Sequence, residues 1–280
     1  MMRSHTRFSA AARIGLRCGR WALAAYLVVL LLLLLLENTL LYPAPRYPVG
    51  DWAAAELVRE EAWFTSADGT KLHGWLFAHD EPRAVILYAH GNGDCVAYLG
   101  PFLAAMRDKL RVSIFAFDYR GYGRSEGAPF EKGILDDARA AQAWLAERTS
   151  KRPDELVLMG RSLGGGVAVD LAALDGARGL VLQNTFTSLP DAAARLYPWA
   201  PVRWLMKNRY DSLAKIHAYE GPIFASHGTL DDLVPMDLGR RLFDAAPSPR
   251  KTFFVIEGAG HNTPEPREYY EALDRWLEDL

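Results

Sequence analysis

The segment LVLMGRSLGGGVAVDLA, residues 156–172, constrains the fold more than any other part of the chain. An apolar run is followed by Ser162, which has Gly160 before it and three glycines at positions 164–166 after it. Glycine loses more backbone freedom on folding than any other residue, so it is costly in regular structure. Its repetition around one serine indicates a backbone turn or a close approach that larger residues would prevent.

The rest of the sequence alternates between strand-like and helix-like segments. A hairpin is expected over 61–78, with its turn at Asp68-Gly69, and short apolar runs predict six further strands, at 84–90, 112–120, 155–160, 179–184, 222–228 and 252–258. Helical spacing is present at 96–110, 134–149, 235–246 and 266–280, where Pro101 calls for a break or a first-turn position. This order predicts an α/β fold with a mostly parallel eight-stranded sheet and helices on both faces.

Three chemically suited side chains follow three of these strands. Ser162 follows the strand at 155–160, Asp231 follows 222–228, and His261 follows 252–258. In such sheets the loops at the carboxyl ends of the strands lie together. Gly160 and Gly164 give the serine the form G-x-S-x-G between strand and helix, which is the nucleophile elbow. The simpler alternative, that Ser162 only caps a helix, leaves the glycines on both sides unexplained.

The order serine, acid, histidine and several longer motifs resemble the α/β-hydrolase superfamily. The segments HGNGD, FDYRGYGRSEG, GRSLGGG, NTFTSLPD, HGTLDDLVP and GAGHN resemble those of membrane-anchored α/β-hydrolase domain-containing proteins and of bacterial serine-aminopeptidase-like hydrolases. The resemblance implies an α/β-hydrolase fold from residue 59 to 280 and a catalytic triad of Ser162, Asp231 and His261. The family pattern HGxxDxxVP favours Asp231 over the neighbouring Asp232.

An oxyanion intermediate would need backbone N–H donors, one from the residue after the nucleophile and one from the loop after the third strand. These are expected to be Leu163 and Asn92, although Gly91 or Gly93 could replace Asn92 in the HGNG loop. His90 and His227 are expected to be structural hydrogen-bonding residues rather than bases.

A short helical cap is expected over about 187–219. Its apolar residues either pack on the core or form a wall for an acyl group, for which Leu196, Trp199 and Trp204 are the candidates. The substrate would then be a small molecule or an acylated compound.

Composition excludes several other classes. The net charge of −2 gives no basis for a nucleic-acid partner, and the two cysteines, Cys18 and Cys95, suggest neither a disulfide scaffold nor a metal site. The serine segment lacks the lysine of a phosphate-binding loop, and GNGDCV lacks the third glycine of a dinucleotide site. We therefore expect no metal and no cofactor, and we expect a monomer.

The N-terminus differs from the rest of the chain. Residues 1–20 carry five arginines and no acid, and residues 21–41 are long and apolar enough for a membrane-spanning signal anchor. A cleaved signal peptide is the alternative, although its apolar core would be shorter. Arginines on this side place the N-terminus in the cytoplasm and the remainder on the other side, the periplasm in a bacterium. Residues 42–58 are expected to be a proline-stiffened linker.

Together these observations predict a membrane-anchored serine hydrolase that cleaves carboxylic esters or thioesters through an acyl-serine intermediate. Peptidase or amidase activity is the nearest alternative. A protein of this fold that binds an acylated ligand or partner without turnover is the other.

Overall fold

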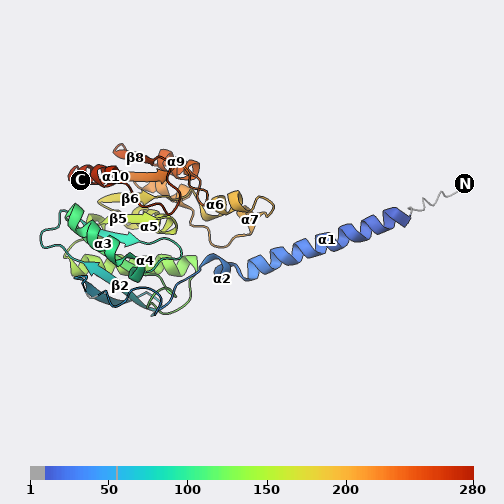
Figure 1. Cartoon of the computed structure of the whole chain (residues 1–280), viewed down its shortest axis with the longest axis horizontal. Helices are drawn as coiled ribbons and strands as arrows, with labels where there is room; N and C mark the ends of the chain where they lie inside the picture. The colour runs from blue at the N-terminus through green and yellow to red at the C-terminus, as the bar shows by residue number, and fades with distance from the viewer. Residues whose placement is uncertain (1–9, 55) are drawn as a thin grey trace, which may run out of the picture. The chain divides into compact units, whose positions relative to one another are not determined.

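The computed structural model describes residues 10–54 and 56–280 of the chain (Figure 1). The chain divides into two compact units, Met1–Leu41 and Tyr42–Leu280.

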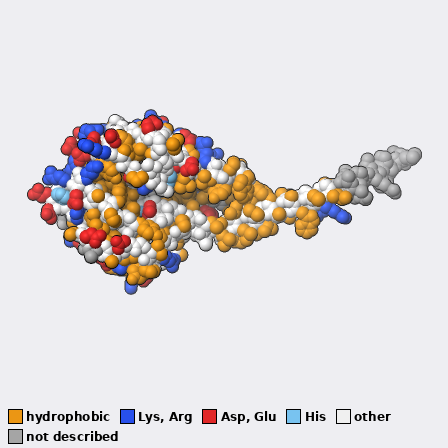
Figure 2. All heavy atoms as spheres, viewed as in Figure 1, with side chains coloured by type: hydrophobic (Ala, Val, Ile, Leu, Met, Phe, Trp, Pro, Cys, Tyr) orange, Lys and Arg blue, Asp and Glu red, His pale blue; other side chains and the backbone are white. Residues whose placement is uncertain are grey.

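The first unit is helical. It consists of α1 (Ala10–Leu35) and the short α2 (Glu37–Leu41), and residues Ile14–Leu35 are long and apolar enough to cross a membrane. At 1.5 Å per residue, α1 measures about 39 Å, which exceeds the hydrocarbon thickness of a bilayer. Hydrophobic side chains are exposed along it, as Figure 2 shows. A membrane-spanning helix and a signal sequence both have this length and apolar composition.

The helical segment differs from the expected span of 21–41. It begins earlier, because the alanines and leucine before Trp21 are good helix formers and continue the helix through the polar region. It also bends at Leu36, so that Glu37 begins a separate helix. Arg3 and Arg7 of the basic segment lie outside the described residues.

The second unit contains the predicted eight-stranded, mostly parallel sheet. Its strands are β1 (Glu60–Thr65), β2 (Lys71–Phe77), β3 (Val85–Ala89), β4 (Ser113–Asp118), β5 (Val157–Arg161), β6 (Gly179–Gln183), β7 (Ile223–Gly228) and β8 (Lys251–Ile256). Their order across the sheet is β1-β2-β4-β3-β5-β6-β7-β8. Only the β1–β2 and β2–β4 pairs are antiparallel. The carboxyl ends of the six parallel strands therefore share one edge, where the functional loops are expected.

Helices cover both faces of this sheet. They are α3 (Val96–Leu110), α4 (Glu131–Arg148), α5 (Leu163–Asp175), α9 (Met236–Ala245) and α10 (Arg267–Glu278), and a 3₁₀ turn at Pro153–Glu155 precedes β5. α3 and α10 share one hydrophobic core with alternate strand residues such as Trp75, Ile114 and Phe224. Phe115, which alternates with Ile114 and so points to the other face, packs on Trp144 of α4 at a ring-centroid distance of 4.5 Å. The sequence prediction of an α/β-hydrolase fold is confirmed.

The cap expected at 187–219 contains α6 (Leu189–Leu196), α7 (Val202–Leu205), α8 (Ser212–Lys215) and a 3₁₀ turn at Ile216–Ala218. Pro101 corrects one expectation, because it lies inside α3 rather than at a break or in the first turn. Proline removes one hydrogen bond of the helix. Leu99 and Leu103, buried on either side of it, hold the helix to the core.

Residues 42–58 are also packed more tightly than a linker would be. Tyr42, Trp52 and Ala54 are buried. The backbone of Pro45 accepts a hydrogen bond from Gly123 N–H, and the N–H of Tyr47 donates to Gly123 O, at 2.7 and 2.8 Å. The segment therefore belongs to the second unit. Composition does not reveal this, because the hydrogen-bond partners of the segment are distant in the sequence.

Candidate active site

Ser162 stands at the sharp turn between β5 and α5. Its φ of +53° and ψ of −116° are unfavourable for a side chain with a Cβ atom, which marks a strained backbone held by its surroundings. The glycines permit the close approach of the strand and helix. A Cβ atom on Gly160 would lie 2.1 Å from the carbonyl oxygen of Gly164, and one on Gly164 would lie 2.0 Å from that of Ala89. Larger residues at either position would force the turn open.

The structure brings His261 and Asp231 to this serine. The Nε2 atom of His261 lies 3.0 Å from Ser162 Oγ, and its Nδ1 atom lies 2.7 Å from an Asp231 carboxylate oxygen. All three residues are at least nine-tenths buried. A carboxylate accepts hydrogen bonds only, so His261 carries a proton on Nδ1 and presents the lone pair of Nε2 to the hydroxyl. This arrangement can take a proton from the serine.

Asp231 is fixed in its ionised form. Burial alone would raise the pKa of this carboxyl, but hydrogen bonds from His227, His261 and the Val234 N–H lower it well below its usual range. The second oxygen also accepts the N–H groups of Leu233 and Val234 at 3.1 and 2.8 Å. Asp232, the alternative acid, has an exposed side chain. The geometry therefore pairs His261 with Asp231.

Two residues hold the loop of His261, and sequence reasoning did not single them out. Arg161 and Asn184 both donate to the backbone carbonyl of His261, at 2.8 and 3.0 Å. Asn184 also accepts the N–H of Gly228 through its side-chain oxygen, which joins the ends of β6 and β7. Their positions offered a signal, because Arg161 lies inside the elbow and Asn184 directly follows a buried strand.

The HGNG loop lies beside the serine. A Cβ atom built on Gly91 would be 3.9 Å from the Cβ atom of Ser162. Leu163 is the first residue of α5, and the first N–H groups of a helix have no acceptor within it. Tyr122, fully buried, donates its hydroxyl hydrogen bond to the side-chain oxygen of Asn92 at 2.6 Å. Sequence reasoning missed this contact, although Tyr122 stands in the RGYG segment.

The histidines at the carboxyl ends of β3 and β7 also contact backbone carbonyl groups. His90 Nδ1 lies 2.8 Å from Gly91 O, and His227 Nε2 lies 2.8 Å from Val234 O. Burial lowers the pKa of His90 and raises that of the Cys95 thiol to about 11. At neutral pH, Cys95 is therefore a protonated core residue rather than a reactive thiolate. Within residues 10–54 and 56–280, no group of three or more acidic, histidine or cysteine side chains could hold a metal ion.

The candidate pocket residues of the cap do not form an enclosed wall. Leu196, Trp199 and Trp204 expose 42, 52 and 86% of their surfaces. An acyl pocket would bury most of such side chains. The sequence pattern identified an apolar set on the cap but not the side to which it points.

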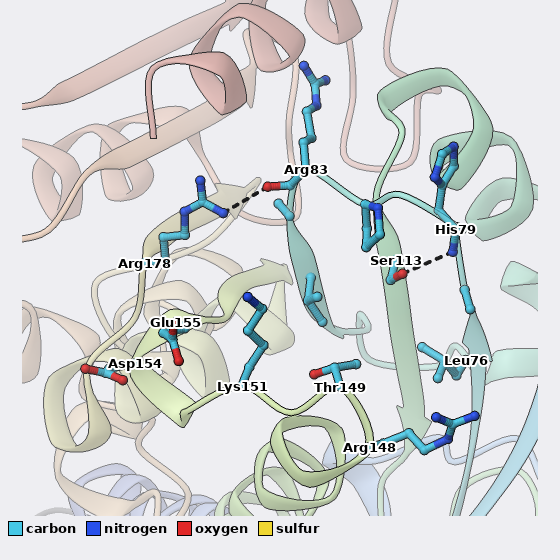
Figure 3. A pocket seen from close by; sticks show the side chains of 14 residues that line it. Leu76, His79, Arg83, Ser113, Arg148, Thr149, Lys151, Asp154, Glu155 and Arg178 are labelled. Carbon is cyan, nitrogen blue, oxygen red and sulfur yellow. Dashed lines mark hydrogen bonds between the residues drawn. The ribbon is translucent and has the colours of Figure 1, made fainter.

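A concavity of about 580 Å³ lies at the opposite, amino-terminal edge of the parallel strands (Figure 3). Two hydrogen bonds join residues of this concavity: Arg178 donates to the carbonyl of Arg83, and Ser113 accepts the N–H of His79. It contains no hydroxyl paired with a buried base. The Ser162 edge is therefore the candidate active site.

Comparison with known proteins places this geometry in a family. Residues 80–215 match the family model described as serine aminopeptidase, S33. The chain is 35% identical over 246 residues to the uncharacterized protein Rv2307c of Mycobacterium tuberculosis, covering 86% of this chain and 87% of that protein. It is 31% identical over 250 residues to the α/β-hydrolase domain-containing protein WAV2 of Arabidopsis thaliana, covering 82 and 77%. The chain belongs to the α/β-hydrolase family.

Solved structures agree with this fold. The Pyrococcus furiosus esterase Pf2001 superposes on this α/β-hydrolase with a TM-score of 0.70 at 21% identity, covering 86% of this chain and 98% of that one. A Paleococcus ferrophilus monoacylglycerol lipase gives a TM-score of 0.57 at 20% identity, covering 74 and 98%. At this identity the likeness concerns the fold.

Proposed function

We propose that this α/β-hydrolase is a serine hydrolase that cleaves carboxylic esters or thioesters through an acyl-serine intermediate. The single observation behind the proposal is the chain of contacts from Ser162 Oγ to His261 Nε2 at 3.0 Å and from His261 Nδ1 to Asp231 at 2.7 Å. A buried hydroxyl, base and carboxylate in this order form the arrangement that activates a serine for acyl transfer.

The first half of the reaction forms the acyl-enzyme. Ser162 Oγ attacks the carbonyl carbon while His261 Nε2 accepts the hydroxyl proton. The resulting imidazolium is stabilised by the ionised Asp231. The carbonyl oxygen becomes an oxyanion, for which the backbone N–H groups of Leu163 and Asn92 are the proposed donors. His261 then gives its proton to the leaving alkoxide or thiolate, and the bond to that group breaks.

The second half releases the product. A water molecule takes the place of the leaving group and gives a proton to His261 as its oxygen attacks the acyl carbon. The collapse of this second oxyanion intermediate returns the proton to Ser162 Oγ and frees the carboxylic acid. Each residue ends in its starting protonation state, and no cofactor is needed for this balance.

The names of similar proteins support hydrolysis but differ on the bond. Two structural neighbours are named an esterase and a monoacylglycerol lipase, whereas the matching family model is named for an aminopeptidase. The alternative of peptide or amide cleavage therefore stays a second candidate. Cleavage of an amide would use the same triad, but it would depend more on the transfer of a proton from His261 to the leaving amine.

We further propose that α1 anchors the enzyme in a membrane. The 22 residues Ile14–Leu35 suit a bilayer in length and composition. The arginines of the N-terminal segment favour a cytoplasmic N-terminus and a catalytic unit on the opposite side.

The test is a substrate series that varies only the bond. Matched ester, thioester and anilide substrates with the same acyl group would be compared with the parent and with Ser162→Ala. We expect ester or thioester turnover in the parent and a loss of about 10⁶-fold in the variant, by analogy with other serine nucleophiles. Faster anilide turnover would favour the amidase candidate. Activity of Ser162→Ala within about tenfold of the parent would contradict the serine mechanism.

A further inference from the structure

The cap presents an exposed apolar surface that the catalytic mechanism does not use. We define this cap face as Leu196, Tyr197, Trp199 and Trp204, which expose between 42 and 86% of their surfaces. Tyr197 and Trp199 lie edge to face with ring centroids 6.5 Å apart. Large apolar side chains exposed together are typical of a surface that contacts a membrane or another molecule.

The stretch of chain that carries the cap face is basic. Residues 195–210 contain Arg195, Arg203, Lys207 and Arg209 and no acidic residue. Arg195 and Arg203 pair with Asp237 and Asp191, which lie outside this stretch. Their side chains stay about half exposed, so these pairs are weak. Tryptophan and tyrosine next to arginine and lysine is the composition found where proteins meet the headgroups of a bilayer.

The chain that leaves the apolar helical segment is fixed to the end of the same stretch. Tyr42, the residue after α2, is only 4% exposed. Its hydroxyl donates to the side-chain oxygen of Asn208 at 2.8 Å and lies 3.1 Å from the hydroxyl of Tyr210. Glu131 at the start of α4 accepts the backbone N–H of Tyr210 at 2.8 Å. The segment that Tyr42 contacts is therefore itself hydrogen-bonded to α4 of the second unit.

This attachment point lies close to the cap face along the chain. Trp204 is four residues before Asn208, so their Cα atoms are separated by at most about 14 Å. Tyr42 is joined to Leu41 by one peptide bond. If Ile14–Leu35 spans a membrane, the span ends seven residues before Tyr42, whose hydroxyl is hydrogen-bonded to Asn208 at the end of the cap-face stretch.

We propose that the cap face is a lipid-binding surface, which lies in the headgroup region of the bilayer that holds the N-terminal helix. This inference rests on the membrane anchoring proposed above and not on the catalytic chemistry. Trp199 and Trp204 would lie at the boundary between headgroups and acyl chains, with the neighbouring cations near lipid phosphates. An acyl lipid of the same bilayer is the substrate class that this placement would favour.

The experiment measures whether Trp204 lies near acyl chains. The full chain is placed at one copy per disc in lipid nanodiscs of phosphatidylcholine and phosphatidylglycerol, with and without bromine on the acyl chains. Tryptophan fluorescence is compared for the parent, Trp204→Phe and Trp63→Phe. Trp63 on β1 is the matched control, because it is 52% exposed and lies outside the cap.

The bromine-quenched fluorescence should fall by roughly one third in Trp204→Phe, because Trp21, Trp199 and Trp204 would contribute similar shares. It should stay unchanged in Trp63→Phe. An equal effect of the two substitutions, or none in Trp204→Phe, would overturn the proposal. The proposal would also be overturned if chains associated through the cap face and Trp204 were not quenched. A second copy of the chain, rather than lipid, would then cover the cap face.

Failure of the chemistry and failure of the docking are kept apart by two controls. The quenching is repeated in a Ser162→Ala background, where it should be unchanged. A Ser162→Ala variant that still hydrolyses esters would contradict the proposed function and leave the docking result standing. A chain that an alkaline wash removes from the discs would contradict anchoring and the lipid-binding surface together.

Discussion

Two buried histidine–aspartate pairs, one within the sheet and one in the loops at its edge, differ in what the imidazole contacts, because only the His261 ring reaches a serine hydroxyl. His261 and Asp231 lie in loops at the carboxyl ends of parallel strands, and Ser162 Oγ is 3.0 Å from the free side of the imidazole. His73 and Asp118 lie on β2 and β4 at 3.1 Å, with both side chains completely buried. Trp63 and Trp52 pack on His73 at ring-centroid distances of 4.8 and 5.6 Å.

The difference lies in what surrounds each pair. In the described part of the chain, the Nε2 atom of His73 has no hydrogen-bond partner. The carboxylate of Asp118 also accepts the N–H of Val96, which fixes the start of α3 behind the HGNGD loop. The pair on β2 and β4 thus holds elements together. A base becomes catalytic when a nucleophile and a route for substrate lie on its other side.

The largest predicted effect separates the two histidines directly. His261→Ala should lower kcat by about 10⁶-fold, because the serine loses its base. His73→Ala should change kcat per folded molecule by less than about tenfold and lower the free energy of unfolding by about 1–3 kcal/mol, since it leaves a buried carboxylate short of a partner. Steady-state kinetics and thermal melts of the purified variants measure both quantities. Equal losses of kcat would mean that the comparison is wrong.

The next effect separates two adjacent carboxylates. Asp231→Asn should lower kcat by about 10⁴-fold, since the amide would favour the wrong imidazole tautomer. Asp232→Asn is the matched control, and its exposed position predicts a change of less than about threefold. Both variants keep the shape of the side chain. If Asp232→Asn were the more damaging substitution, the acid would have to be reassigned.

Acidification tests the acid and the base of the first pair separately. The pKa of Asp231 is held well below its usual range, so this carboxylate stays ionised between about pH 5 and 8. Activity lost on acidification in this interval is therefore not due to Asp231, and a decline in kcat/KM is the result that a histidine base predicts. A rate profile for a small ester measures this. A flat profile across the interval would contradict a histidine base.

The smallest predicted effect concerns the HGNG loop, which contains the proposed oxyanion donor Asn92. Tyr122→Phe removes the donor to the Asn92 side chain and should lower kcat by about 2–10-fold with little change in KM, since one neutral hydrogen bond contributes about 1 kcal/mol. Tyr98→Phe, at a tyrosine on α3 that is 47% exposed, is the control. A rise in KM without a change in kcat would indicate that Tyr122 acts on substrate binding instead.

The sequence predicted the sheet and the strained serine turn because both depend on local patterns. Buried strands appear as short apolar runs. The close approach of Gly160 to Gly164, which leaves no room for a side chain at either position, involves only five consecutive residues. The loops of Ser162, Asp231 and His261 could be placed together because parallel strands share one edge. These inferences need periodicity and topology only.

Contacts between distant segments could not be predicted in the same way. The hydrogen bond from Tyr42 to Asn208 joins residues 166 positions apart, and prolines near Tyr42 indicate stiffness without indicating a partner. The exposure of Trp204 likewise depends on the path of the whole cap. Tyr122 was visible as one letter of a glycine-rich loop, but its contact with Asn92 follows from the turn that positions both.

The most direct test of the central claim is covalent labelling by a fluorophosphonate followed by peptide mass spectrometry. The full chain and its His261→Ala and His73→Ala variants would be treated in parallel. The proposed triad predicts one adduct, on Ser162, in the parent and in His73→Ala, and almost none in His261→Ala. An unlabelled parent, or an adduct that persists at Ser162 without His261, would contradict activation of this serine by that histidine.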